Sequence, residues 1–554
     1  MLNKLAQLKS SVYAETVSHL RLLIIKKENI LAYFSSLYRI ILIVLYAVLF
    51  LPHAFVVVKD LGLITSYEVD PGSIVHSILS LFQNSYNMNA AYHSKYYGWT
   101  YYSINYFLLI PIHLAKALKI VTDDYYFFVG IRFILFMIGL ASVLAYLEVA
   151  KRTLKHAFLS FTAALLYIAS PIVSRFFYFL HPETTGMLFL FLGILCLLRY
   201  NEGQAEDYRW YTFGLLALVL SVLSKHVFLF TAIPVIFLFI YFYCHHHNSS
   251  VFSFLISKQF VTALLATILF SVLIFFLINP FAFFQPQTFI KNQVNFFSGH
   301  THSSLTSSEA FRKWREIIKA SPVIFISLIL SPLTLLGAAI LGQDQKTGKT
   351  LYIVNIIGSI FFVAIISVSS RLIIFDGYLA PIYPFFILNL ISIPLYIFRK
   401  SNVGFIRFSV ILSLIYVLFF LLVGGFSVSI PAAYTRLMYK DSVVYKSYNY
   451  IEEQIPSGSK IAHDRFVAIP SDKGITACHY WQGCGTDYIE KFQPDYVIFS
   501  EDQKFNGETP LQTLRLIKYV NDHHFLLIDT INGANSDALG DRNITINVWK
   551  HVDN

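Results

Sequence analysis

Residues 126–155 read YFFVGIRFILFMIGLASVLAYLEVAKRTLK, and this stretch decides the class of fold. Its first part, 126–147, is largely apolar, and Arg132 is its single charged residue. That length suits a helix crossing the hydrocarbon core of a bilayer, which takes about 20 residues. Lys151, Arg152 and Lys155 follow directly, and such basic clusters favour the cytoplasmic side. The stretch therefore predicts a transmembrane helix that ends in the cytoplasm.

The composition of the whole chain agrees with a membrane protein. Of its 554 residues, 56% are apolar and 13% are charged, whereas soluble domains average about 25% charged residues. This excludes a soluble globular enzyme. The net charge is +10, but residues 430–554 carry −4, so the positive excess lies on the apolar part. Such a distribution is typical of membrane topology, and we expect no nucleic-acid partner.

Apolar runs of similar length recur between short polar connectors. Eleven candidate spans result: 40–58, 126–147, 157–178, 183–200, 209–225, 227–243, 261–279, 322–341, 351–369, 377–396 and 408–427. A basic N-terminal segment without a cleavage pattern predicts an uncleaved anchor with a cytoplasmic N-terminus. Residues 102–118 are apolar too, but as a span they would export the Lys151 cluster. We expect them to form a juxtamembrane or re-entrant helix.

An odd number of spans places three polar segments together on the extracytoplasmic side, namely 59–125, 280–321 and 430–554. Segment 430–554 contains both helix-like and strand-like sequence patterns. A helical stretch at 443–455 precedes strand-like runs at 460–469, 495–500, 525–531 and 544–550. The fold prediction is thus an all-α polytopic membrane module, 1–429, followed by a small extracytoplasmic α/β domain, 430–554. Cys478 and Cys484 of that domain lie on the predicted oxidising side, where a disulfide and free thiols both stay open.

Several segments carry a family resemblance in their order along the chain. They are YEVDPGSIVHSILSL (67–81), SPIVSRFFYFLHPETTG (170–186), SVLSKHVFLFTAIP (221–234), INPFAFFQPQTFIKNQVNFFSGHTHSS (278–304) and RLIIFDGYLAPIYPFFILNL (371–390). Together they resemble the GT-C glycosyltransferases, especially the branch similar to protein O-mannosyltransferases and lipid A aminoarabinose transferases. Many relatives have an Asp-Glu pair in the first loop. Here Asp70 is followed by Pro71, and Glu68 is the only nearby Glu, so either carboxylate can be the family acid.

The resemblance implies a GT-C fold, a polyprenyl-phosphate-linked sugar donor reached from the membrane lipid, and inversion at the anomeric carbon. It places the protein in the inner or plasma membrane with a periplasmic or extracellular active site, or in the ER membrane of a eukaryote. The acceptor stays open, since protein, lipid A, other lipids and glycans are all used in this superfamily.

The chemistry of such a transfer needs a base for the acceptor hydroxyl. Asp70, or alternatively Glu68, is the candidate base, and Glu183 is the candidate that orients the acceptor or a metal. Both Asp70 and Glu183 also have purely structural explanations. Asp70 before Pro71 is a common helix start, and Glu183 is a first-turn acid that a helix dipole favours. These residues name no cofactor, and a divalent metal stays open.

The leaving phosphate needs fixed positive charge. Lys225, Arg371 and His300 are the candidate donor-phosphate ligands, and Arg371 stands at the head of a late span as in the resembling family. Lysine side chains near span ends also snorkel to the interface without any ligand. His181, two residues before Glu183, is as a lone histidine more often a polar contact than a ligand.

Two other classes of function compete with an enzyme. A transporter or flippase of lipid-linked saccharides places charges at mid-bilayer and often shows repeated halves. Here the charges gather at one face, and no internal repeat is visible. A scaffold that binds partners through its tail is the other alternative, and aromatic outer loops with acids at span exits fit it poorly.

Overall fold

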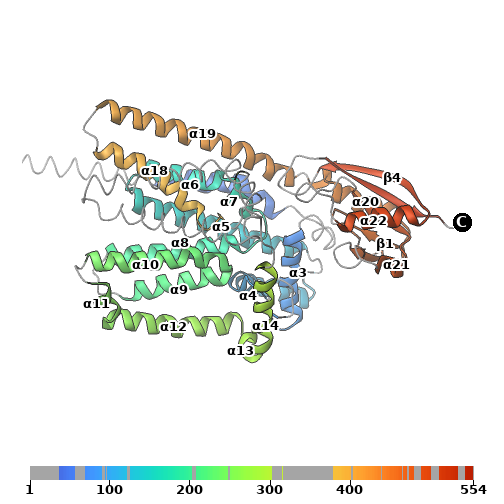
Figure 1. The fold of residues 1–554 in the computed structure, drawn as a ribbon, viewed down its shortest axis with the longest axis horizontal. Helices are drawn as coiled ribbons and strands as arrows, with labels where there is room; N and C mark the ends of the chain where they lie inside the picture. The colour runs from blue at the N-terminus through green and yellow to red at the C-terminus, as the bar shows by residue number, and fades with distance from the viewer. Residues whose placement is uncertain are drawn as a thin grey trace, which may run out of the picture.

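The structure, a computed structural model, is mainly helical, and a small sheet lies at its C-terminal end (Figure 1). It describes residues 36–55, 69–89, 94, 96–121, 125–202, 208–246, 250–301, 315, 379–400, 404–437, 439–464, 466–470, 473–479, 484, 488–500, 511–534 and 543–552.

Within these residues, five helices are long and apolar enough to cross a membrane, or six if one bent pair is a single span. They are Ser36–Ala54, α5 (Tyr125–Leu154), α8 (Glu183–Glu202), α12 (Lys258–Ile278), α19 (Gly404–Leu437) and the pair formed by α6 (Ala157–Ala169) with α7 (Pro171–Ser174). Shorter apolar helices are α9 (Tyr208–Ser224), α10 (Leu229–His246) and α18 (Tyr383–Lys400). The protein is therefore a helical multi-pass membrane protein.

Each of these helices coincides with a predicted span. The predicted spans 322–341 and 351–369 lie outside the described residues, so the total of eleven stays a prediction. The predicted domain boundary at residue 430 falls inside α19, which continues to Leu437.

The predicted span 157–178 is bent rather than straight. The two parts of the pair meet at 62°, and Ser170 between them has an extended backbone. Pro171 causes this break because the residue before a proline is pushed out of the helical region. After the bend, the short helix η1 (Arg175–Phe177) leads to α8, which begins at Glu183.

Glycines let α8 and α9 pack closely side by side. A Cβ on Gly193 would lie 3.0 Å from the carbonyl oxygen of Gly214, and a Cβ on Gly214 would lie 2.6 Å from Cγ of Leu197. The Ser221 hydroxyl of α9 also donates to the Gly186 carbonyl of α8 at 2.7 Å. Because the two helices are antiparallel neighbours, the end of α9 lies beside the start of α8.

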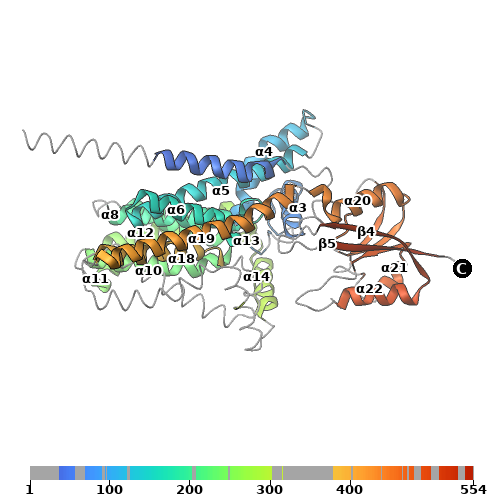
Figure 2. The ribbon, with the colours of Figure 1, turned by 90° about the horizontal axis from the view of Figure 1, so that it is seen from above.

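The described parts of the three predicted outer segments lie at one end of the bundle. Figures 1 and 2 show α3 (Val69–Gln83), α4 (Trp99–Ala117), α13 (Phe281–Phe284) and α14 (Pro286–Thr301) at the end that faces the C-terminal sheet. Helix α4 covers the segment that we expected to be juxtamembrane or re-entrant, and it is not among the span candidates.

The opposite end carries the side chains that the sequence assigns to the cytoplasm. The first helix starts there, and α11 (Val251–Leu255) lies there as well (Figure 2). Arg39 donates to Glu148 at 2.8 Å, and Lys151 lies 3.6 Å from the same carboxylate. Lys151 and Arg39 therefore share one end, as the topology prediction requires.

The C-terminal sheet has five strands in the order β2-β1-β3-β5-β4. Strand β1 (Lys460–His463) runs parallel to β2 (Thr476–His479) and to β3 (Tyr496–Phe499). Strand β5 (Asn543–His551) is antiparallel to β3 and to β4 (Phe525–Ala534). Alternate residues of β1 and β3 face opposite sides. On one side they meet α20 (Val443–Gln454), and on the other α21 (Tyr488–Phe492) and α22 (Leu511–Asp522).

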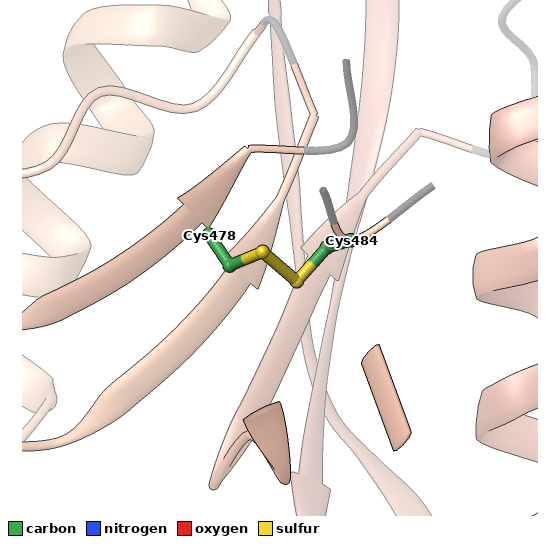
Figure 3. The surroundings of a disulfide bond; sticks show 2 residues. All are labelled: Cys478 and Cys484. Atoms are coloured by element: carbon green, nitrogen blue, oxygen red, sulfur yellow. A yellow bond between two sulfur atoms is a disulfide. The ribbon is translucent and has the colours of Figure 1, made fainter. Parts of the chain in front are cut away.

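The helix and the four strands predicted in this region are confirmed at α20, β1, β3, β4 and β5. Strand β2 has only four residues and was not predicted. Cys478, in β2, forms a disulfide with Cys484, and the two Cα atoms lie 5.6 Å apart (Figure 3). This settles the alternative that the cysteine spacing left open.

One apolar cluster joins the sheet region to the bundle. It contains Ile74, Val75 and Ile78 of α3 together with Val444 and Ile451 of α20. Each of these side chains is at most 1% exposed. The C-terminal domain and the helix whose first turn carries Asp70 thus contribute to the same buried apolar cluster.

Two histidines face each other in the sheet. His463 and His479 are register partners on β1 and β2, with ring centroids 5.1 Å apart. Burial lowers the pKa of His463 to about 4. Burial, helped by His463, lowers the pKa of His479 to about 3. Both imidazoles are therefore neutral in the folded domain at pH 7.

We expect acid to destabilise this domain before its carboxylates titrate. The unfolded chain takes up protons on both histidines near pH 6.5 and the folded chain does not, so stability falls as pH falls from about 6.5 towards 4. The lowered pKa of His463 alone reduces the free energy of unfolding at pH 5 by about 2 kcal/mol, relative to neutral pH. Hydrogen exchange of β1 and β2 in the full-length protein, corrected for intrinsic rates, measures the loss. His463→Leu should reduce it, and exposed His524→Gln should leave it unchanged; equal protection at pH 7 and pH 5 would contradict the prediction.

Candidate functional site

A buried carboxylate marks the end of the bundle where α3, α4 and α14 gather. Glu183 is the first residue of α8, and it is 1% exposed. One carboxylate oxygen, Oε1, contacts Nζ of Lys225, and the other, Oε2, contacts Nδ1 of His181. Three side chains from two neighbouring helix ends thus form one polar cluster, which we call the Glu183 cluster.

The local structure explains how the protein tolerates this buried charge. Glu183 lies at a helix N-terminus, where the dipole and the unpaired N–H groups favour an anion. Lys225 lies after the end of α9, where its backbone is extended before the short helix η2 (His226–Phe228). The Lys225 side chain is 11% exposed, and its Nζ lies 5.7 Å from the ring centre of Tyr97. The opposite charge and the aromatic face both stabilise the ammonium.

An aromatic wall extends from this cluster to the end of α12. The Trp99 ring lies 5.6 Å from the ring of His226, the neighbour of Lys225. It also lies 5.4 Å from Phe275 of α12 and 5.5 Å from Phe289 of α14. Trp99 Nε1 donates to the carbonyl of Ser94 at 2.8 Å, so the indole is held in one orientation.

Asn279 lies directly after α12, beyond Phe275. The Asn279 N–H donates to the Phe275 carbonyl at 2.7 Å. The preceding carbonyl, that of Ile278, accepts the Tyr86 hydroxyl at 2.8 Å. The Asn279 side chain is 0% exposed, yet within the described structure neither its Nδ2 nor its Oδ1 has a hydrogen-bond partner. Such a buried, unpaired amide is unusual in a folded protein.

The structure describes some of the predicted site residues in full, some by their backbone only, and some not at all. Glu183 and Lys225 are described with their side chains. Asp70 is the second residue of α3, and His300 is in the last turn of α14, and for both only the backbone is described. Glu68 and Arg371 lie outside the described residues.

The structure brings two of the predicted site residues, Glu183 and Lys225, into contact. The sequence assigned Glu183 to the acceptor or a metal and Lys225 to the donor phosphate, and both roles stay predictions. The two side chains form one ion pair, so the Lys225 ammonium has an anionic neighbour. The pairing arises because the close packing of α8 with α9 brings the start of one beside the end of the other.

Three further residues of this end were not assigned a role from the sequence. His181 shares the Glu183 carboxylate, and its position two residues upstream was the available signal. Trp99 and Asn279 stand out only through their surroundings, which the sequence does not show. In the described parts of the chain, no group of three or more His, Cys, Asp or Glu side chains is arranged to hold a metal. A divalent metal therefore stays a prediction.

Comparison with known proteins gives matches at the level of structure only. No family model and no curated protein matches the sequence. The structure is similar to that of ArnT from Cupriavidus metallidurans bound to undecaprenyl phosphate. This likeness covers 91% of this chain and 98% of that chain, with 12% identity and a TM-score of 0.47. It is also similar to archaeal oligosaccharyltransferase AglB from Archaeoglobus fulgidus, solved with an inhibitory peptide and a dolichol-phosphate. Here the coverage is 84% of this chain and 70% of that chain, with 11% identity and a TM-score of 0.43.

Proposed function

We propose that the protein is an integral membrane glycosyltransferase that moves a sugar from a polyprenyl-phosphate-linked donor to an acceptor hydroxyl on the extracytoplasmic side. The observation that carries the proposal is the Glu183 cluster. A buried carboxylate bound by a lysine and a histidine lies at the bundle end that also holds the first turn of α3 and the last turn of α14. Ionisable groups buried within membrane segments are costly and usually functional.

The sequence motifs that resemble GT-C enzymes supply the class of donor in this proposal. The acceptor oxygen attacks the anomeric carbon from the face opposite the phosphate. The bond from that carbon to the phosphate oxygen breaks, and its electron pair leaves with the polyprenyl phosphate. The acceptor proton passes to Asp70, or to Glu68 in the alternative assignment, and the sugar inverts.

The charges have separate tasks in this scheme. Lys225 stabilises the negative charge on the departing phosphate, together with Arg371 and His300. Glu183 holds Lys225 in place, and it orients the acceptor or a metal. Fixed positive charge in a site poor in water stabilises a developing anion far more than it would in bulk solvent.

The test is donor turnover by the purified full-length protein in nanodiscs. A panel of undecaprenyl phosphates carrying mannose, glucose, galactose or aminoarabinose is supplied with crude membrane acceptors, and release of bare undecaprenyl phosphate is measured. We expect turnover by the wild type, and at least a 100-fold lower rate for Glu183→Gln. Glu148→Gln, at the opposite end of the bundle, is the matched control and should keep the wild-type rate. A flippase would move the donor intact and release no bare phosphate, which would refute the proposal.

A further inference from the structure

We infer that Asn279 is a specificity-determining residue that hydrogen-bonds a hydroxyl of the transferred sugar. The inference rests on the proposed function and refines it, because it assigns the sugar end of the donor to a part of the site distinct from the Glu183 cluster.

The first observation is the unpaired amide. A carboxamide offers two N–H donors and an oxygen with two lone pairs. In Asn279 none of these is used among the described residues, although the residue is 0% exposed. A leucine of similar shape would avoid the cost of burying an unpaired amide. A ligand that both donates and accepts hydrogen bonds would satisfy it.

The second observation is the position of this amide relative to the cation. Asn279 is the residue directly after α12, and its N–H donates to the carbonyl of Phe275 one turn earlier. The Phe275 ring contacts the Trp99 ring, and the Trp99 ring contacts that of His226, the residue after Lys225. The aromatic wall thus runs from the end of α12, which Asn279 caps, to the residue after the lysine that the proposal gives to the phosphate. A glycosyl phosphate presents its sugar directly beside its phosphate.

The chemistry of the amide favours a hydroxyl over a phosphate. Phosphate oxygens at neutral pH mainly accept, so they would pair with Nδ2 and repel Oδ1. A sugar hydroxyl donates to Oδ1 and accepts from Nδ2. Asn279 therefore suits the neutral part of a glycosyl phosphate, and Lys225 suits its charged part.

Asn279 is 0% exposed, so a ligand reaches it only after a neighbouring segment moves, and in this proposal that is the segment that follows it. Pro280 begins the turn into α13 and α14, and this segment exposes apolar side chains. Phe284 is 70% exposed, and Ile290 and Val294 are each 59% exposed. Segments that bury little apolar surface open at low free-energy cost. Displacement of Phe289 from Trp99 would open a path along the aromatic wall.

Binding in nanodiscs tests the inference without relying on turnover. Native mass spectrometry compares bare undecaprenyl phosphate with the same sugar-bearing panel. We expect the wild type to bind at least one glycosyl phosphate about tenfold more tightly than the bare lipid. Asn279→Leu should remove this preference, leave binding of the bare lipid unchanged, and keep or raise the thermal unfolding midpoint. Ser271→Ala, which changes another polar residue of α12, is the matched control and should behave as the wild type.

A second variant guards against a folding defect in the first. Asn279→Ala removes both donors and the acceptor without adding bulk or charge, so it should also lose the preference. The inference is overturned if the wild type shows no preference within the panel, or if Asn279→Leu retains it. It is also overturned, as a statement about the donor, if Asn279→Leu raises only the acceptor KM. A wild type that prefers glycosyl phosphates but never transfers sugar would refute the proposed function and leave the inference standing.

Discussion

Replacing Lys225 with methionine is expected to lower the free energy of unfolding by about 3–5 kcal/mol. The change leaves Glu183 buried, at 1% exposed, without its main opposite charge. His181 remains as a partner, but it compensates the carboxylate only when protonated. The effect is large because desolvation of a carboxylate is repaid only by a close opposite charge. Equilibrium unfolding in mixed micelles measures it.

The double variant Glu183→Gln/Lys225→Met should recover most of the lost stability, because no unpaired charge remains. It should not recover sugar transfer, since both functional groups are gone. Lys151→Met is the matched control. Its partner Glu148 is 34% exposed, and exposed pairs contribute about 0–1 kcal/mol. A double variant that is less stable than Lys225→Met alone would contradict the account of the pair.

The largest expected effect on rate is that of Asp70→Asn. Loss of a general base lowers kcat by about 10²–10⁴-fold, while the donor KM should change little. Folding should tolerate the change, because Asn at the second residue of α3 loses only its favourable charge at the helix N-terminus, worth about 0.3–1 kcal/mol. Single-turnover transfer with the best donor of the panel measures the rate of the chemical step.

Glu68→Gln is the matched control for this prediction. The two carboxylates are two residues apart, and the sequence left the choice of base open between them. If Glu68→Gln loses activity and Asp70→Asn keeps it, Glu68 is the base. If both variants transfer sugar at the wild-type rate, neither carboxylate of the first loop accepts the proton, and the assignment of the base to this loop is wrong.

The sequence predicted the helices well because each carries its own signal. A run such as 126–147 needs no neighbour to be recognised, since its length and apolarity suffice. The same holds for strands β3 and β5, whose apolar residues mark them out. Strand β2 was missed because its four residues, Thr476–His479, form a pattern too short to stand out.

The sequence identified several residues of the candidate site, but it did not predict the contacts between them. Glu183 and Lys225 stood out as rare charges at span ends, and topology placed both at one end. Their pairing depends on which helices are neighbours, and Gly193 and Gly214 decide that through a close approach that the sequence alone does not reveal. Asn279 was noted only as part of a loop motif. Its amide is buried without a hydrogen-bond partner among the described residues. That property depends on how the helices pack, so the sequence could not show it.

The apolar cluster shared by α3 and α20 has a consequence for experiments that truncate the chain. Ile74, Val75 and Ile78 belong to the same buried cluster as side chains of the C-terminal domain, so removal of that domain would take away part of the core around them. The helix that bears Asp70 would then lose part of its support. A truncated protein without activity would not show that the domain binds substrate or partner, because the domain also shares an apolar core with α3. A substitution within the domain, away from α3, separates the two roles cleanly.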